Sequence, residues 1–211
     1  MLSRLQQTQR LHTSVYLVIG SVICLALSLF RVDYTNSRMF IFLNWNLFLA
    51  FIPWVLSSVL ILYPELQNRK RFMIITLGVW LLFFPNAPYI LTDLYHLRLQ
   101  TAMPVWFDMM LILSYAWVGL LFGMMSLWDM EHLMTRWVKQ KWIPIISSVL
   151  LLIGSFGIYI GRFLRWNSWD VIQQPLALVY DVGDRIVNPF SHPRTWAVTL
   201  LMWLFLNMVY W

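Results

Sequence analysis

The chain has 211 residues, of which 60% are hydrophobic and only 11% are charged, and its mean hydropathy is +0.67. A soluble domain carries about 25% charged residues. The apolar residues here form long uninterrupted blocks, and each block approaches the roughly 20 residues that a helix needs to cross about 30 Å of hydrocarbon. The composition therefore excludes a soluble domain and predicts an all-α, polytopic transmembrane helical bundle.

The net charge of +6 is carried largely by Lys and Arg in short loops that flank the apolar blocks. Basic residues in such loops set membrane topology, so this charge does not indicate nucleic-acid binding. The single cysteine, Cys24, lies inside the first block, which excludes a disulfide framework and a thiolate metal cluster.

We predict six spans within a single transmembrane domain, residues 1–211. The spans run at about Thr13–Phe30, Met39–Tyr63, Phe72–Leu94, Val105–Trp128, Ile143–Leu164 and Trp196–Trp211, each boundary to within several residues. The one long connection, Arg165 to Thr195, contains enough apolar residues to lie along the membrane interface as a short helix or re-entrant segment.

The distribution of Lys and Arg favours one orientation. Strict alternation of the spans places 8 of these residues on the side of the N-terminus and 7 on the other. Arg162 and Arg165 sit at a span end within a polar motif and are weak topology signals, and without them the counts are 8 and 5. The excess predicts that both termini are cytoplasmic.

Five polar motifs fall on one face of the membrane when the spans alternate, and the charge count makes that face extracytoplasmic. They are "LNWN" (43–46), "PNAPYILTDLYHL" (85–97), "WFD" (106–108), "GRFLRWNSWD" (161–170) and "SHPR" (191–194). The other halves of the spans contain few ionisable groups. This pattern predicts a one-sided polar site.

Span three breaks at Pro85 and Pro88. Residues 72–84 extend only about 20 Å as a helix, so the break lies at membrane depth. Such a break is tolerated where it is buried in protein or lines a wet cavity. Asn86 is expected to cap a restarted helix with Pro88 in its first turn, and that helix would carry Tyr89, Thr92, Asp93 and His96 on one face. The alternative is a proline kink followed by polar residues in headgroup water.

Span five carries glycines at i, i+3 and i+7 (Gly154, Gly157 and Gly161), followed by Arg162 and Arg165. One interpretation is a packing seam of small residues that ends in interfacial Arg and Trp anchors. The other is a guanidinium pair that neutralises Asp93, Asp108 or Asp170 or grips an anionic headgroup. Asp108 has its own simpler interpretation, as a partner for the N-terminal dipole of span four.

These patterns yield a set of candidate site residues. Asp93, His96 and Asp108 are the predicted catalytic groups, and they are also candidate ligands of a divalent metal, with Asp170 or His192 as further candidates. No HExxH or other fixed ligand spacing supports the metal, so the cofactor stays open. The predicted ligand-binding residues are Asn44, Asn46, Asn86, Tyr89, Arg162, Arg165, Trp166, Asn167 and Asp170. Asn44 and Asn46 are about 200° apart on a helix, so both face one site only if their helix begins late.

The motifs "LNWNLFLA", "FPNAPYILTDLYHL", "WFD" and "GRFLRWNSWD" resemble those of a family of bacterial integral membrane proteins known as a domain of unknown function. The resemblance spans most of the chain, from span two through the segment after span five. It implies a bacterial multi-pass protein and implies no activity. We expect the protein to lie in the inner (cytoplasmic) membrane.

Three hypotheses for function follow from the residues. The first is a membrane-embedded enzyme that acts on a lipid-phase or envelope substrate, with the carboxylates and His96 as acid, base or metal ligands and Arg162 and Arg165 as an anion clamp. The second is a non-catalytic subunit that binds membrane lipids or other membrane protein subunits. The third is a transporter, which would need polar groups through the full membrane depth.

Overall fold

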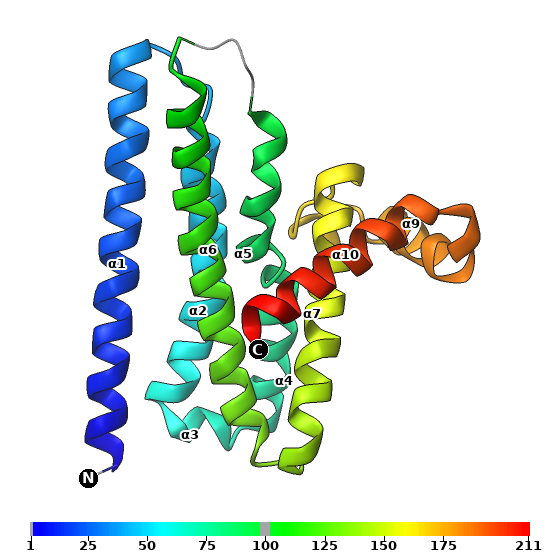
Figure 1. The fold of residues 1–211 in the computed structure, drawn as a ribbon. Coiled ribbons are helices and arrows are strands. Elements are labelled where there is room, and N and C mark those ends of the chain that lie inside the picture. Colours follow the sequence, from blue (N-terminus) through cyan, green and yellow to red (C-terminus); the bar gives the residue numbers. More distant parts are fainter. Residues whose placement is uncertain (1, 98–101) are drawn as a thin grey trace. The chain divides into compact units, whose positions relative to one another are not determined.

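The computed structural model describes residues 2–97 and 102–211, with side chains described from Arg10 onward. Within these ranges the regular secondary structure is helical and contains no strand, which confirms the predicted all-α class (Figure 1). Two basic residues used in the topology count, Arg4 and Arg98, have side chains outside the described part.

The longer helices are α1 (Leu2–Thr35), α2 (Phe42–Leu62), α4 (Lys70–Phe83), α6 (Val105–Met134), α7 (Ile143–Tyr159), α9 (Pro175–Val187) and α10 (Pro193–Tyr210). Short elements connect them: α3 (Pro64–Gln67), α5 (Asn86–Tyr89), η1 (Ile90–His96), η2 (Gln140–Trp142), η3 (Ile160–Leu164), α8 (Asp170–Gln173) and η4 (Pro189–Ser191).

Among the described residues, five helical segments are long and apolar enough to cross a membrane: Arg10–Thr35, Phe42–Leu62, Lys70–His96, Val105–Met134 and Gln140–Leu164. They correspond to the first five predicted spans, and the protein is a membrane protein. The sixth predicted span is helical as α10, but α10 is not among these five. Its 18 residues include Pro193, Arg194 and Asn207, which reduce its hydropathy.

The chain divides into two compact units, and the divisions fall at helix-breaking or small residues. The first unit contains residues 1–51 and 86–123, and the second contains residues 52–85 and 124–211. The divisions therefore lie next to Pro53 in α2, between Pro85 and Asn86, and at Gly123 in α6. The break predicted in span three is one of these divisions.

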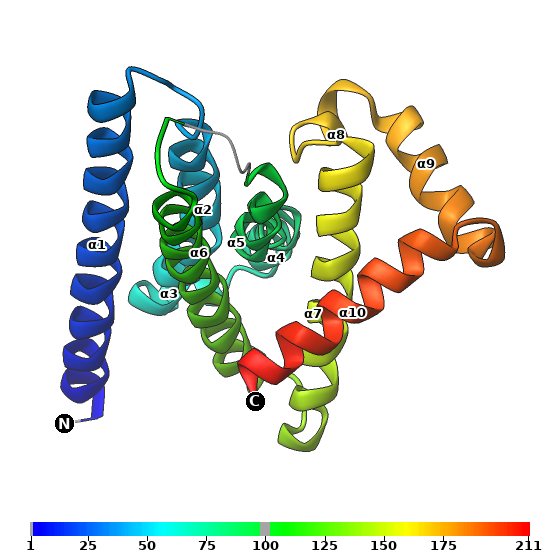
Figure 2. The same cartoon turned by 45° about the horizontal axis from the view of Figure 1, so that its top comes forward.

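In the first unit, α6 is the central helix. Figures 1 and 2 show the first halves of α2 and α6 running beside α1. The buried face of α6 includes Asp108, Ile112 and Tyr115, which are 0% exposed. Gly119 on the same helix lets α5 approach closely, because a Cβ there would lie 2.9 Å from the carbonyl oxygen of Ala87.

In the second unit, α7 packs against α10 and against the end of α4, and α4 contacts the second half of α6. Trp80 on α4 donates its indole N–H to Ser126 on α6 at 3.2 Å. The ring of Trp196 near the start of α10 stacks on Phe156 at 5.7 Å, and Trp203 donates to the Ser148 carbonyl at 2.9 Å. Residue numbers rise along α10 as they fall along α7, so the two helices pack antiparallel.

Candidate functional site

The predicted site residues divide between the two units. Asn44, Asn46, Asn86, Tyr89, Asp93, His96 and Asp108 belong to the first. Arg162, Arg165, Trp166, Asn167 and Asp170 belong to the second. The contacts within each unit assign these residues different roles.

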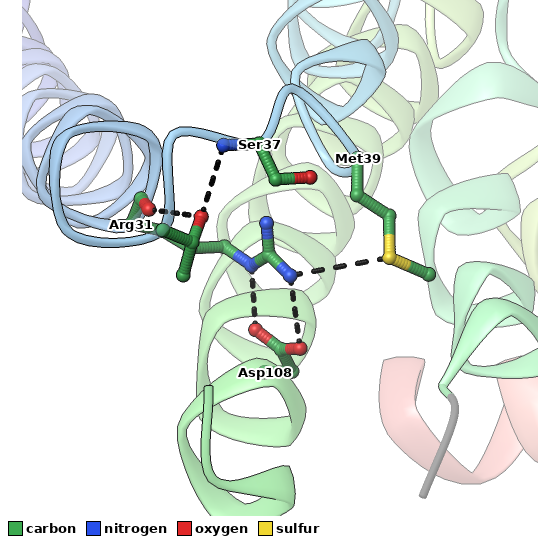
Figure 3. Close-up of polar contacts among 5 residues, drawn as sticks. Arg31, Ser37, Met39 and Asp108 are labelled. Atoms are coloured by element: carbon green, nitrogen blue, oxygen red, sulfur yellow. Dashed lines mark hydrogen bonds and ion pairs between the residues drawn. The ribbon is translucent and has the colours of Figure 1, made fainter. Parts of the chain in front are cut away.

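The most buried polar contact of the first unit joins Arg31 at the end of α1 to Asp108 at the start of α6 (Figure 3). The Arg31 Nε lies 2.6 Å from one carboxylate oxygen and the second guanidinium nitrogen lies 3.2 Å from the other, so the pair is bidentate. The side chains are only 2% and 0% exposed. Both charges are therefore removed from solvent. A buried ion pair is stable only if its geometry is close, because both groups lose their hydration.

The surroundings of Arg31 are largely apolar. Its guanidinium carbon lies 4.5 Å from the centroid of the Phe40 ring, and the Met39 sulfur lies 4.0 Å from the nitrogen that also binds Asp108. The remaining nitrogen, Nη1, is buried and has no hydrogen-bond partner among the described residues. The topology count treats Arg31 only as a charge that flanks a span, whereas the structure shows that its guanidinium binds Asp108.

A second contact holds the segment after the proline break. Asn46 on α2 donates its amide to the carboxylate of Asp93 at 2.8 Å, and Asp93 is 1% exposed. Asp93 lies in η1, a 3₁₀ helix of seven residues, and not in the α-helix that the sequence predicted after Asn86. In this geometry Thr92 and Asp93 are buried, whereas His96 at the end of η1 is exposed. A period of three residues keeps Asp93 and His96 on one side of η1 and turns Thr92 away from them, so the predicted stripe of an α-helix is only partly present.

Asn44 faces a different neighbour from Asn46, as expected from their angular separation in a helix that begins at Phe42. The Asn44 amide donates to the Ser28 hydroxyl at 3.2 Å, and its carbonyl oxygen accepts a hydrogen bond from Tyr115. The two asparagines thus join α2 to α1 and α6 on one side and to η1 on the other.

The three candidate metal ligands do not come together. No group of three His, Cys, Asp or Glu side chains within the described residues could hold a metal ion. Asp108 is engaged by Arg31, Asp93 accepts from Asn46, and the His96 ring packs edge-on against Phe42 at 5.3 Å. The metal hypothesis therefore receives no support from the geometry of the first unit.

In the second unit, two glycines of span five pack against the end of α4. A Cβ on Gly154 would lie 2.9 Å from the Phe84 ring, and one on Gly157 would lie 2.6 Å from Pro85. These distances are shorter than side chains tolerate, so both positions require glycine. The close packing that the glycine spacing predicts is therefore present at Gly154 and Gly157.

The arginine motif lies at the C-terminal end of α7. The helix widens into the π-helix η3, which contains Arg162, and Arg165 follows in a left-handed conformation with φ of 63°. Arg165 is exposed and Arg162 is half-buried. At the start of α10, the guanidinium of Arg194 lies 4.4 Å from the centroid of the Phe163 ring, so a third arginine lies beside η3.

The loop after Arg165 is fixed by its own polar contacts. Asp170, at the start of α8, accepts the backbone N–H of Asn167 at 2.6 Å and its side-chain amide at 3.2 Å. The Ser168 hydroxyl donates to the Leu82 carbonyl of α4 at 3.2 Å. Trp166 donates its indole N–H to Asp181 on α9 at 2.8 Å. The loop therefore connects α4, α8 and α9.

Further polar contacts, which the motifs did not predict, hold α9. Asp184 receives hydrogen bonds from Asn188 at 2.7 Å and from the His192 ring at 2.7 Å. These bonds favour the ionised carboxylate, so they lower the pKa of Asp184 below its usual value. The composition of the 165–195 connection had predicted an interfacial segment without identifying these partners.

Comparison with known proteins identifies a family but no function. A family model described as a protein of unknown function (DUF1361) matches residues 45–209. No curated protein and no solved structure matches the chain.

Proposed function

This chain belongs to the DUF1361 family of proteins of unknown function, and we propose that it is a multi-pass protein of the bacterial cytoplasmic membrane that binds an anionic headgroup without chemistry. The binding site is the end of α7, where Arg162 lies in η3, Arg165 follows it and Arg194 packs on Phe163 of η3. The observation that carries the proposal is the backbone of Arg165, an exposed arginine in the left-handed region.

The left-handed conformation costs a non-glycine residue roughly 1–2 kcal/mol. Such strain persists only where the surroundings impose it, and it concentrates at ligand sites. Here the backbone N–H of Arg165 bonds to the Ile160 carbonyl, and the following loop is held by Ser168 and Asp170. A π-helix immediately before the residue adds a second feature that recurs at functional sites.

The chemistry of the three arginines suits a phosphate or carboxylate. A guanidinium presents parallel N–H donors that match such anions in a bidentate arrangement. The C-terminal dipole of α7 also favours a cation, at about 0.3–1 kcal/mol. The dipole accounts for a positive charge at this end, but it does not account for the choice of arginine at a left-handed position, where glycine is less strained.

Substitution of Arg165 tests the proposal because two variants separate binding from folding. Arg165→Gly removes the guanidinium and the backbone strain together, so the protein should remain at least as stable while it loses bound lipid. Arg165→Lys keeps the charge without the bidentate donors and should retain less lipid than the wild type. Native mass spectrometry with phosphatidylglycerol and phosphatidylcholine measures both effects.

The matched control is Arg136→Ala, which removes an exposed arginine of the same unit beyond the end of α6. It should leave phosphatidylglycerol binding unchanged. If Arg165→Gly retains phosphatidylglycerol as well as Arg136→Ala does, the arginines are interfacial anchors and the proposed binding site is wrong.

An enzyme remains the second candidate because of one arrangement in the first unit. Asp93 is almost fully buried, and His96, three residues later, is exposed. A carboxylate beside an accessible imidazole is a common acid–base combination. Lipid extracts of cells that express the wild type should then contain a product that is missing with His96→Gln and present with the control His132→Gln. Identical extracts would reject the enzyme.

We propose that the end of α7, α9 and His192 lie on the extracytoplasmic side, as the distribution of Lys and Arg predicts. Because Cys24 is buried, single cysteines can be tested in an almost unreactive background. Cysteine at the exposed position Ser191 should react with an impermeant maleimide in intact cells, and cysteine at the exposed position Lys139 should not. The reverse pattern would invert the topology.

A further inference from the structure

The apolar side chains of α9 and its neighbours point away from the rest of the second unit. Tyr180 is 75% exposed, Val187 is 75% exposed and Phe190 is 97% exposed. On the helix, Leu176, Val179, Tyr180, Gly183, Ile186 and Val187 form one stripe about 120° wide, as the 100° step per residue places them. Figure 2 shows α9 leading from α8 to α10.

The charged side of α9 is turned toward the chain. Asp181 accepts from Trp166, and Arg185 lies 3.7 Å from Asp181 on its own helix. The Arg185 carbonyl accepts the indole N–H of Trp196 at 3.1 Å, and Asp184 is bound to His192 at 2.7 Å. These contacts come from the loop after η3 and from the start of α10, so they fix which side of α9 faces outward.

This arrangement reverses that of a surface helix in a soluble protein, which turns its apolar stripe inward and its charged side to water. An apolar stripe that faces outward implies that the environment outside the second unit is apolar, whereas the part of the chain that α9 contacts is polar. Five segments of the same chain are suited to cross a membrane, so lipid surrounds the second unit. We infer that α9 lies in the plane of the membrane interface and inserts its apolar stripe among the lipids of one leaflet.

Two further features favour lipid as the occupant of this stripe. The 13 residues of α9 extend about 20 Å, which is too short to cross about 30 Å of hydrocarbon but suits a helix lying at the interface. Trp166 and Trp196, which hold α9, belong to the residue type that concentrates at membrane interfaces. The inference rests on the apolar stripe and is independent of the arginine site.

Depth measurement with nitroxide labels tests the inference in the full-length protein. Cysteines at Val179 and Val187, in a Cys24→Ala background, place labels in the stripe, and Asn188 provides a control on the polar side. The protein is reconstituted in vesicles of phosphatidylcholine and phosphatidylglycerol. Labels at 179 and 187 should collide more with oxygen than with a water-soluble nickel complex, at a depth of about 5–10 Å, while the label at 188 should show the opposite preference.

Three other results would overturn the inference. Labels at 179 and 187 that respond like the label at 188 would place the stripe in water. Labels that are shielded from both reagents would show that a second copy or another protein covers the stripe. Different environments at 179 and 187 would exclude a helix lying in the plane, because both positions belong to one stripe. A loss of phosphatidylglycerol binding in Arg165→Gly would leave all of these results unchanged.

Discussion

The two units of the chain hold their ion pairs in different surroundings. In the first, the groups lie among membrane-crossing helices and are paired in the interior, as Arg31 with Asp108 and Asn46 with Asp93. In the second, the most elaborate contacts lie outside the crossing helices, around Asp184, where side chains are partly exposed. Because hydrocarbon offers no alternative partner, the first arrangement makes each polar group necessary for folding. The second leaves groups such as Arg165 accessible to a ligand.

Arg31→Ala should lower the stability of the protein more than any other substitution that tests this comparison. It leaves the Asp108 carboxylate buried without its guanidinium, and stranding one member of a buried pair costs about 3–5 kcal/mol. Thermal unfolding in detergent measures the loss. Arg38→Ala, which removes an exposed arginine of the same unit, should change stability by no more than about 0.5 kcal/mol.

The double substitution Arg31→Met with Asp108→Leu tests whether the loss comes from the stranded charge. Replacing both charged side chains by apolar ones removes the cost of burying either charge. Its stability should recover much of what Arg31→Ala loses. If Arg31→Ala were as stable as Arg38→Ala, the first unit would not depend on internal pairing and the contrast between the units would fail.

A matched pair of asparagines compares the units directly. Asn46→Ala removes the amide that donates to the buried Asp93, and the loss of a hydrogen bond to a buried carboxyl group costs about 1–3 kcal/mol. Asn188→Ala removes an amide that donates to the partly exposed Asp184, where water replaces it, so the change should stay within about 0.5 kcal/mol. Equal losses in detergent unfolding would contradict the distinction.

In the second unit, the stability of the protein should be sensitive to the size of the side chain at position 157. Gly157→Ala places a methyl group 2.6 Å from Pro85 and should cost about 1–3 kcal/mol through overpacking. Gly78→Ala is the control in α4, where nothing lies within 4 Å of the new methyl group, and it should stabilise the helix by about 0.8–1 kcal/mol. A destabilised Gly78→Ala with a neutral Gly157→Ala would refute the seam.

The features predicted from sequence were those that local patterns encode. Apolar blocks predicted six spans, and five of these correspond to the segments suited to cross a membrane. Paired prolines predicted the break after Phe84, and glycine spacing predicted the close approach to α7. Each depends on residues within a few turns of one another, where chain geometry relates sequence to structure. The break also coincides with a division between the two units, which composition does not reveal.

The contacts that were not predicted join distant parts of the chain. Arg31 and Asp108 are 77 residues apart, and a charge at a span end resembles a topology signal until its partner is known. The 3₁₀ geometry of η1 was not predicted, because the α-helical period was assumed for residues 90–96; that period places Thr92 on one face with Asp93 and His96, whereas a period of three turns Thr92 away from them. In the structure Asp93 is buried and His96 is exposed, although a period of three residues places both on one side of η1. Their proposed catalytic roles remain predictions.

The smallest expected effect is the pH dependence of α9. Hydrogen bonds from Asn188 and His192 lower the pKa of Asp184 below its unfolded value of about 3.9. A lowered carboxylate pKa contributes stability above the unfolded pKa, and this contribution is lost as the pH falls through the folded pKa. A nitroxide at Val187 should therefore keep the same mobility from neutral pH down to about pH 4 and become more mobile only at lower pH. Asn188→Ala removes the larger cause and should move that transition toward higher pH. A transition well above pH 5 in the otherwise unsubstituted labelled protein would show that another group, and not Asp184, controls the packing of α9.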